Sequence, residues 1–185
     1  LNIRIPHDVI GAAESLYKAI SINAIKSTLI FSPPGYGKTT LLRDLARNIS
    51  QSCNLNVLIF DERNEISGLD GNGKGFDLGK NCDVVRGANK LCAFVNAIRV
   101  MSPQVLITDE LYGDIDAQAV SYAVECGISV IASSHSVDIQ VLKAMPFERF
   151  VKLTGIGKEA VVYDKNFNFI CNCATVGRAG NGCIG

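Results

Sequence analysis

Short runs of β-forming apolar residues alternate with longer segments of helical periodicity along most of the chain. Five of these runs predict core strands, over residues 28–31, 57–61, 105–109, 128–133 and 149–153. Strands that alternate with helices are typical of a parallel sheet covered by helices. The pattern therefore predicts an α/β fold with a mostly parallel sheet flanked by helices.

Apolar residues three or four positions apart predict amphipathic helices around these strands. Their apolar faces are formed by Val9, Ala12, Ala13, Leu16, Ala19 and Ile20; by Leu41, Leu42, Leu45, Ala46 and Ile49; by Leu91, Phe94, Val95, Ile98 and Met101; and by Ala117, Val120, Ala123 and Val124. In the second of these helices, polar residues occupy the opposite side, namely Arg43, Asp44, Arg47 and Asn48.

The rest of the chain carries turn and loop signals. Residues 67–80 contain five glycines and no helical or strand period, which predicts a mobile loop. Residues 160–163 and 167–171 flank Lys165-Asn166 and predict a C-terminal β-hairpin. The glycine-rich end, 177–185, is expected to fray.

The first predicted strand leads into a glycine-rich turn, Ser32-Pro-Pro-Gly-Tyr-Gly-Lys-Thr-Thr40, and then into a helix. Backbone N–H groups in such a turn, and the positive end of the helix that follows, favour an anionic phosphate chain. Lys38 is placed to reach the β- and γ-phosphates, and the Thr39 hydroxyl to ligate Mg²⁺. The predicted nucleotide-binding residues are Pro34, Gly35, Tyr36, Gly37, Lys38, Thr39 and Thr40.

One position departs from the usual phosphate-loop pattern, since Ser32 stands where the first glycine is expected. The alternative interpretation is an ordinary Gly/Pro turn that carries a solvated lysine. The strand before the turn and the helix after it favour the nucleotide site, because the motif requires that context.

Two of the predicted strands end in acidic residues. Asp109 and Glu110 end one strand, and Asp61 and Glu62 end another. We predict that Asp109 holds Mg²⁺ and that Glu110 orients or activates the attacking water. Glu62 either shares these duties or pairs with Arg63 across a subunit boundary. A solvated charged turn is the alternative at both places.

His135 follows the fourth predicted strand, where it is placed to sense a γ-phosphate. A structural, hydrogen-bonded histidine is the alternative. The other histidine, His7, is interpreted as a surface or linker residue.

The composition suits one globular domain. The 185 residues are 48% hydrophobic, and 18 basic residues balance 18 acidic ones. This neutral balance gives no reason to expect a nucleic acid partner. The chain has no apolar run long enough to span a bilayer and no signal-peptide core, which predicts a cytoplasmic protein. Because the chain begins with Leu1, we expect that a native N-terminal segment is missing.

Seven cysteines, an odd number without a C-x-x-C pair, indicate reduced thiols rather than a disulfide framework. The group Cys171, Cys173 and Cys183 fits no common zinc spacing, so a metal site there is the weaker interpretation.

Four sequence blocks carry a family resemblance: Ser32-Pro-Pro-Gly-Tyr-Gly-Lys-Thr-Thr-Leu-Leu-Arg-Asp44, Asp61-Glu-Arg-Asn-Glu-Ile66, Ile98-Arg-Val-Met-Ser-Pro-Gln-Val105 and Thr108-Asp-Glu110. From about Asn2 to about Tyr163, the chain resembles the stage III sporulation protein AA family of endospore-forming bacteria. The resemblance implies a RecA-like P-loop ATPase, related to type II and type IV secretion and pilus motors, that uses ATP and Mg²⁺. It implies site roles for Lys38, Thr39, Glu62, Asp109, Glu110 and His135.

The resemblance also implies partners. Such motors form rings, so a homo-oligomer, expected to be a hexamer, would act with the sporulation channel and membrane proteins that link mother cell and forespore. The chain would lie in the mother-cell cytoplasm, beside that membrane complex. Asn81-Cys82 stands where an arginine followed by threonine is expected, which weakens the case for an intersubunit arginine there. Arg63, Arg86 and Arg99 are the other candidates for a charge-stabilising arginine.

We expect three regions: an N-terminal linker and helix over 1–27, a RecA-like ATPase domain over 28–174, and a flexible tail over 175–185. An N-terminal domain that helps close the nucleotide cleft in related motors would be absent from this chain. The main rival function is a nucleotide-gated assembly module with little hydrolysis. An enzyme that acts on nucleic acid is a second rival. A GTPase is disfavoured, because Asn89-Lys-Leu-Cys92 is not the guanine-reading Asn-Lys-x-Asp motif.

Overall fold

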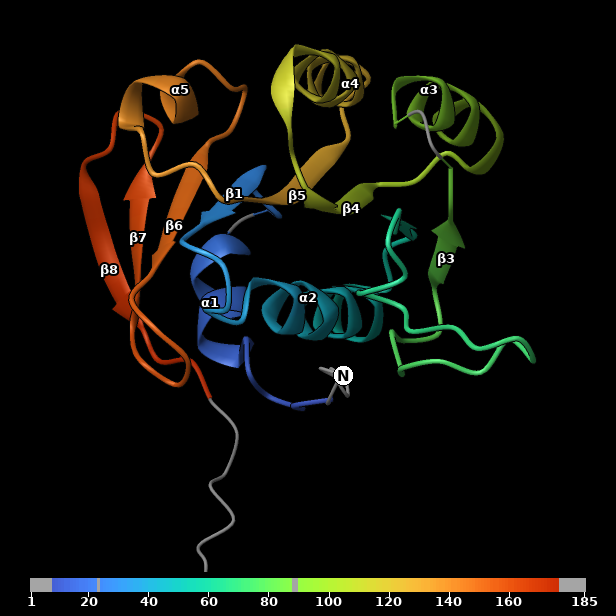
Figure 1. Ribbon diagram of the computed structural model, residues 1–185, viewed down its shortest axis with the longest axis horizontal. Coiled ribbons are helices and arrows are strands. Elements are labelled where there is room, and N and C mark those ends of the chain that lie inside the picture. Colours follow the sequence, from blue (N-terminus) through green and yellow to red (C-terminus); the bar gives the residue numbers. More distant parts are fainter. Residues whose placement is uncertain (1–7, 23, 88–89, 177–185) are drawn as a thin grey trace, which may run out of the picture.

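An eight-stranded sheet organises the molecule, of which this computed structural model describes residues 8–22, 24–87 and 90–176 (Figure 1). Its strands are β1 (Thr28–Phe31), β2 (Val57–Phe60), β3 (Cys82–Val85), β4 (Val105–Glu110), β5 (Ser129–Ser134), β6 (Arg149–Leu153), β7 (Ala160–Asp164) and β8 (Phe169–Cys173). They are arranged in the order β3-β2-β4-β5-β1-β6-β7-β8. β1 to β6 run parallel to one another, and β7 and β8 add antiparallel strands beside β6 at one edge. The predicted mostly parallel α/β fold and the C-terminal hairpin are confirmed.

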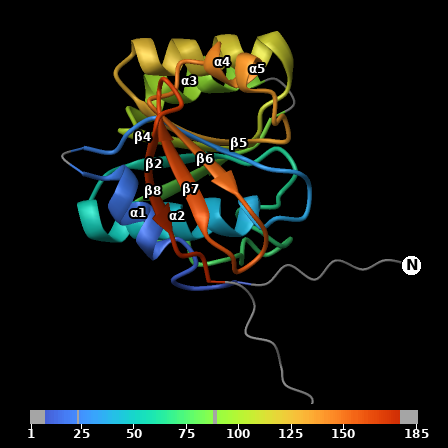
Figure 2. The ribbon, with the colours of Figure 1, turned by 90° about the vertical axis from the view of Figure 1, so that its left-hand side faces the viewer.

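Helices cover both faces of this sheet. They are α1 (Glu14–Ile20), α2 (Lys38–Cys53), α3 (Lys90–Met101), α4 (Gly113–Glu125) and α5 (Ile139–Lys143). Figures 1 and 2 show α1 and α2 on one face, and α3, α4 and α5 on the other. Alternate residues of each strand supply the two separate cores, as Ile30 faces α1 and α2 while Leu29 faces the opposite layer.

The parallel strands decide where functional side chains can gather. Because β1, β2, β4, β5 and β6 point the same way, the loops that follow them share one edge of the sheet. Consecutive strands in the sequence are not all neighbours, since β1 lies between β5 and β6. The glycine-rich turn after β1 therefore opens between the ends of β5 and β6.

The sequence pattern did not predict two elements, β3 and α5. β3 reads Cys-Asp-Val-Val and is only partly buried, so it lacks the apolar run that marks the central strands. α5 has five residues, too few for a helical period to appear. The parallel ladder with β2, rather than local apolar sequence, defines β3.

Two predicted boundaries were wrong. The first helix begins at Glu14 rather than at Val9, because Gly11 adopts a positive φ of 81° and breaks the helical path. The second strand of the hairpin begins at Phe169 rather than at residue 167, because Phe167 has φ 64° and lies in the turn. The strand predicted over 57–61 ends one residue earlier, at Phe60.

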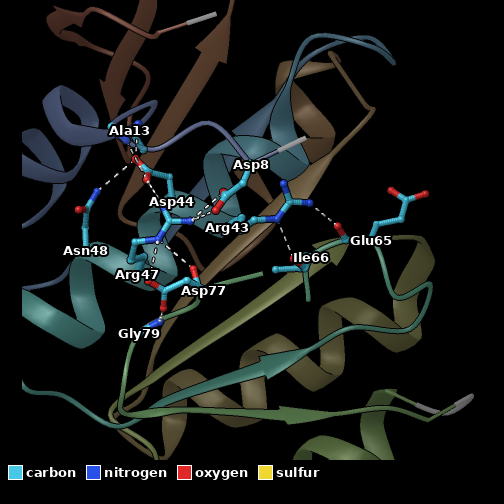
Figure 3. A network of polar contacts seen from close by, with 11 residues as sticks. Asp8, Ala13, Arg43, Asp44, Arg47, Asn48, Glu65, Ile66, Asp77 and Gly79 are labelled. Atoms are coloured by element: carbon cyan, nitrogen blue, oxygen red, sulfur yellow. Dashed lines mark hydrogen bonds and ion pairs between the residues drawn. The ribbon is translucent and has the colours of Figure 1, made fainter. Parts of the chain in front are cut away.

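The polar side of α2 is buried, and its charged residues bind neighbouring segments (Figure 3). The Asp44 carboxylate accepts hydrogen bonds from the backbone N–H groups of Gly11 (3.1 Å) and Ala13 (2.8 Å). Arg47 lies 2.8 Å from both Asp44 and Asp8. These bonds, in which the charges compensate one another, fasten the segment that precedes α1 to α2.

Arg43 attaches a second segment to α2. Its guanidinium donates to the backbone oxygens of Ile66 (2.8 Å) and Glu65 (2.7 Å) (Figure 3). It also lies over the Phe76 ring. The loop between β2 and β3 is thereby attached to α2. The described structure has neither helix nor strand within residues 67–80, in agreement with the loop that was predicted, whereas the mobility of that loop stays a prediction.

The predictions for His7, for Cys183 and for the tail 177–185 concern residues outside the described part of the chain. Among the helices within the described ranges, none combines the length and apolar character that a membrane-spanning helix needs.

Candidate active site

A cavity of about 780 Å³ opens beside the glycine-rich turn, within the size range of small-molecule sites. All the predicted site residues except Glu62 contribute to its walls: Pro34, Gly35, Tyr36, Gly37, Lys38, Thr39, Thr40, Asp109, Glu110 and His135. These residues come from three places in the sequence, the loop after β1, the end of β4 and the end of β5. The shared strand edge brings them together.

The backbone of the turn explains its glycines. Gly35 and Gly37 have φ of 81° and 90°, a region that other residues rarely adopt. Gly37 also precedes the first residue of α2, so the unpaired N–H groups at the start of this helix lie beside the cavity. Ser32 has no positive φ, so its backbone does not require the glycine usual at that position.

Lys38 is buried and folded against the turn. Its Nζ donates to the backbone oxygens of Ser32 (2.8 Å) and Pro33 (3.1 Å) and lies 2.9 Å from His135 Nδ1. Burial lowers the pKa of Lys38 to about 8, while the negative charge of Glu110 acts in the opposite direction. The lysine is still mostly protonated at neutral pH and keeps its charge for an anionic ligand.

His135 joins Lys38 to Glu110. An ammonium group can only donate, so Nδ1 of His135 must accept from Lys38 and carries no proton. The other ring nitrogen, Nε2, lies 3.3 Å from Glu110 Oε1. The three side chains form a Lys38–His135–Glu110 chain across the cavity.

Glu110 has a second partner, because its Oε2 lies 3.1 Å from Arg63 Nη1. Arg63 is largely exposed, so this ion pair is weak and easily exchanged. Both carboxylate oxygens of Glu110 are therefore engaged in this structure, one by a histidine and one by an arginine.

Asp109 is buried at the end of β4, with only 6% of its surface exposed. Burial raises its pKa to about 7; the positive charge of Lys90 lowers it, and nearby carboxylates raise it further. The residue lines the cavity beside the phosphate turn, and a carboxylate at such a place is suited to a cation.

The donor set fits Mg²⁺. A hydroxyl from Thr39 and a carboxylate from Asp109 both line the cavity, and Mg²⁺ prefers such oxygen ligands together with phosphate oxygens. Both residues were predicted for this role. The geometry is compatible with it, and the role itself stays a prediction.

The second acidic strand end differs from what the sequence suggested. Asp61 is fully buried and serves the backbone, since it accepts from the N–H groups of Glu65 (2.9 Å) and Ser67 (2.7 Å). Glu62 lies outside the cavity, half exposed, 3.8 Å from Lys90 Nζ. Glu65 lines the cavity in its place. The structure therefore does not bring Glu62 to the phosphate turn, and its catalytic role stays a prediction without support from this geometry.

Lys90 is a part of the site that sequence reasoning missed. It begins α3 and its side chain is only 6% exposed. Its Nζ contacts the Glu110 backbone oxygen, lies 3.1 Å from Asp116 and approaches Glu62. The sequence offered no signal for this, because a lysine at the start of an amphipathic helix is usually solvated.

The candidate arginines are dispersed. Arg63 contacts Glu110, Arg86 donates to Asn64 Oδ1 at 2.6 Å, and Arg99 is exposed on α3. Of these three candidates, Arg63 lines the cavity and the other two do not. A role in stabilising charge in another subunit stays a prediction for all three.

The fold defines a class. Solved structures with a similar fold include the Legionella pneumophila ATPase DotB (TM-score 0.59, 15% identity, 89% of this chain and 49% of that chain) and the VirB11 ATPase of the Brucella suis type IV secretion system (0.55, 13%, 82% and 55%). They also include the genome packaging NTPase B204 of Sulfolobus turreted icosahedral virus 2, in complex with ATP-gammaS (0.56, 12%, 82% and 98%). Identities this low speak for the fold alone. The chain has the RecA-like P-loop NTPase fold of secretion ATPases.

The sequence identifies the family. The family described as "Sporulation stage III, protein AA" matches residues 1–166, and the chain belongs to it. Stage III sporulation protein AA of Bacillus subtilis is 37% identical over 91% of this chain, and the protein ycf45 of Cyanidium caldarium, described as uncharacterized, is 32% identical over 87%. The matched regions cover 61% and 47% of those two proteins. The family resemblance predicted from the sequence blocks is confirmed.

Proposed function

We propose that this chain binds ATP and hydrolyses it to ADP and phosphate, with Mg²⁺, as the motor domain of a secretion-like channel complex between mother cell and forespore. The observation that carries the proposal is the convergence of Lys38, His135 and Glu110 on one cavity beside the glycine-rich turn. Membership of the sporulation family and the fold of secretion ATPases support it.

Binding would use groups that are already in position. The N–H groups at the start of α2 and the helix dipole favour the phosphate chain. Lys38 would exchange the carbonyl oxygens of Ser32 and Pro33 for phosphate oxygens. Since one ammonium cannot serve all these acceptors, phosphate binding would also release His135 Nδ1.

Hydrolysis would depend on Glu110. Its carboxylate would accept a hydrogen bond from the attacking water and align that water with the γ-phosphate. Lys38 would stabilise the charge that develops on the phosphate oxygens. Mg²⁺ held by Thr39 and Asp109 would neutralise part of the phosphate charge when bound. His135 would link the position of Lys38 to that of Glu110.

The motor proposal includes assembly and location. A ring, proposed as a hexamer, would complete each site with a charged group from the next subunit and would generate force as the subunits move. It would act in the mother-cell cytoplasm beside sporulation channel proteins. The division into 1–27, 28–174 and 175–185 belongs to the same proposal.

The test is steady-state ATP hydrolysis by the purified chain over a range of protein concentrations, with Glu110→Gln as the control. Specific activity that rises with concentration and is lost in the variant supports an oligomeric ATPase. A wild-type rate equal to that of Glu110→Gln, with ATP binding intact, rejects hydrolysis by this chain.

A nucleotide-gated assembly module is the second candidate function. The observation in its favour is that Arg63 and His135 already engage both oxygens of Glu110. If the carboxylate stayed engaged with ATP bound, the chain would bind nucleotide without positioning water. Sedimentation with and without ATP separates the two functions, because a gated module changes its assembly state with ATP while turnover stays at the level of Glu110→Gln.

A further inference from the structure

Two cysteines lie side by side on β8, the strand at one edge of the sheet (Figure 1). Cys171 and Cys173 are two positions apart on this strand, so their side chains leave the same face of it. Their Sγ atoms are 3.9 Å apart. Both thiols are free. Cys173 is buried in the core beneath the sheet, whereas Cys171 is only partly buried and is the more accessible of the two.

The position of β8 allows the strand to bend. It ends the sheet order, and its register with β7 shifts between the pairs Val162–Cys171 and Tyr163–Phe169. The ladder is therefore already irregular beside Cys171. In an extended strand, Cα atoms two positions apart are separated by about 6.6 Å, which is near the upper limit for a disulfide. A bond between the two sulfur atoms would thus shorten and bend β8 at this place.

The segment that follows Cys173 forms part of the wall of the cavity. Thr175 and Val176 both line it. The Thr175 hydroxyl donates to the backbone oxygen of Lys158, and the Val176 N–H donates to the backbone oxygen of Ala12 (3.4 Å). Because these two contacts lie close to Cys173 in the sequence, a bend at the cysteines would displace this part of the cavity wall.

We propose that Cys171 and Cys173 are a reversible redox switch, which closes as a disulfide when a small-molecule disulfide oxidises it and thereby weakens nucleotide binding at the cavity. The effect on nucleotide binding rests on the proposed function, whereas the disulfide chemistry does not. In a protein whose cysteines are otherwise reduced, a disulfide that forms and opens again is typical of redox sensing.

The chemistry consists of two thiol–disulfide exchanges. Cys171 loses its proton, and its thiolate attacks one sulfur of the small disulfide, whose other half leaves as a thiolate and takes up a proton. Cys173 then loses its proton and attacks the Cys171 sulfur of the mixed disulfide, which expels the second small thiolate, and this thiolate is protonated in turn. The two protein thiols are oxidised to a disulfide, and the small disulfide is reduced to two thiols.

Burial decides which cysteine reacts first. Burial, with a further contribution from the neighbouring Cys171, raises the pKa of the Cys173 thiol to about 11. A buried thiol that stays protonated is a poor first nucleophile, so the first exchange falls to Cys171. Once Cys171 is part of a mixed disulfide it can no longer carry a negative charge. Its contribution to the raised pKa of Cys173 is then lost, which favours the second exchange.

Peptide mapping of the full chain after treatment with oxidised glutathione tests the disulfide. Trypsin releases a peptide, 166–178, in which Cys171 and Cys173 are the only cysteines. In the treated wild type this peptide should resist alkylation and be lighter than the dithiol form by two hydrogen atoms, and dithiothreitol should restore alkylation. Cys171→Ser and Cys173→Ala should each leave the remaining cysteine open to alkylation after dithiothreitol and form no such disulfide. A peptide that keeps both thiols, carries two glutathione groups or is joined to another cysteine overturns the proposal.

Calorimetry with MgATP tests the effect on the cavity. The oxidised wild type should bind MgATP at least about fivefold more weakly than the reduced wild type. The same treatment should leave the affinity of Cys171→Ser unchanged, and Cys173→Ala provides a second variant that lacks the pair. Cys126→Ser is the matched control, because Cys126 is an exposed cysteine at the end of α4. It should respond to oxidation like the wild type.

The outcomes separate the switch from the function. If the disulfide forms and the affinity for MgATP stays the same, the pair is not a switch, while the proposed function stands. An equal loss of affinity in treated Cys171→Ser would assign the effect to other cysteines and also overturn the switch. If the reduced wild type does not bind MgATP, the proposed function fails and the switch fails with it, whatever the peptide map shows.

Discussion

Lys38 and His135 are 97 positions apart in the sequence, yet Lys38 Nζ lies 2.9 Å from His135 Nδ1. The contact joins the lysine that is predicted to bind phosphate and the histidine that is predicted to sense the γ-phosphate. Because His135 also lies beside Glu110, phosphate binding would affect the carboxylate that is proposed to position water.

Substitution of His135 by Asn should separate binding from turnover. Asparagine can replace one hydrogen bond of the imidazole but cannot bridge Lys38 and Glu110. We expect kcat for ATP hydrolysis to fall about 10- to 100-fold while ATP affinity changes little. Ser136→Ala, beside it, is the control. A proportional loss of affinity and rate would show that His135 acts only as a packing residue.

Lys38→Ala and Glu110→Gln should have opposite effects on binding. Removal of the ammonium should abolish tight ATP binding, because the phosphate charge then lacks its main side-chain partner. Glu110→Gln should retain ATP and stop turnover, since an amide cannot accept the proton of the water. Calorimetry and phosphate release measure the two effects, and equal ATP binding by wild type and Lys38→Ala would refute the site.

Lys90→Met should lower kcat for ATP hydrolysis more than ATP affinity. The substitution keeps the length of the side chain but removes the cation that contacts the Glu110 backbone and Asp116. We expect about a tenfold loss of rate from misplacement of Glu110. Lys90→Arg should recover part of the rate. Loss of the native circular dichroism spectrum in Lys90→Met would instead indicate a purely structural lysine.

Asp44→Asn should destabilise the fold, although Asp44 itself does not line the cavity. The amide is isosteric but leaves the buried Arg47 with less compensation and weakens the acceptor for Gly11 and Ala13. The expected loss in the free energy of unfolding is about 2–4 kcal/mol, measured by urea titration. Asp114→Asn, at an exposed position, should unfold like the wild type.

Stability should fall at alkaline pH because of Cys82. Burial raises the pKa of its thiol to about 11, and the thiol donates to the Leu78 backbone oxygen. The folded state holds this proton more tightly than the unfolded chain, where the pKa is about 8.5. The protonated thiol therefore stabilises the folded state fully below about pH 8.5. This stabilisation is lost as the pH rises toward 11. Over this pH range the urea midpoint of unfolding should depend less steeply on pH in Cys82→Ala than in the wild type. Cys126→Ala should keep the wild-type dependence, because Cys126 is exposed.

Local sequence predicted the central strands, α2 and the phosphate turn because each has a local cause: an apolar run, a helical period, or glycines at positions of positive φ. β3 escaped prediction because its pairing with β2, rather than its composition, defines it. Asp61 and Glu62 could not be told apart, since neighbours along the chain point to different surroundings. The same holds for the buried charges of α2, whose partners outside the helix lie more than 20 positions away.

α2 has attachments along its length. Its first turn faces the phosphate site, Arg43 holds the loop after β2, and Asp44 and Arg47 hold the segment before α1. A tilt of this one helix would move both segments together. Occupancy of the cavity, which lies beside the first turn of α2, would thus change the positions of two segments that are far apart in the sequence.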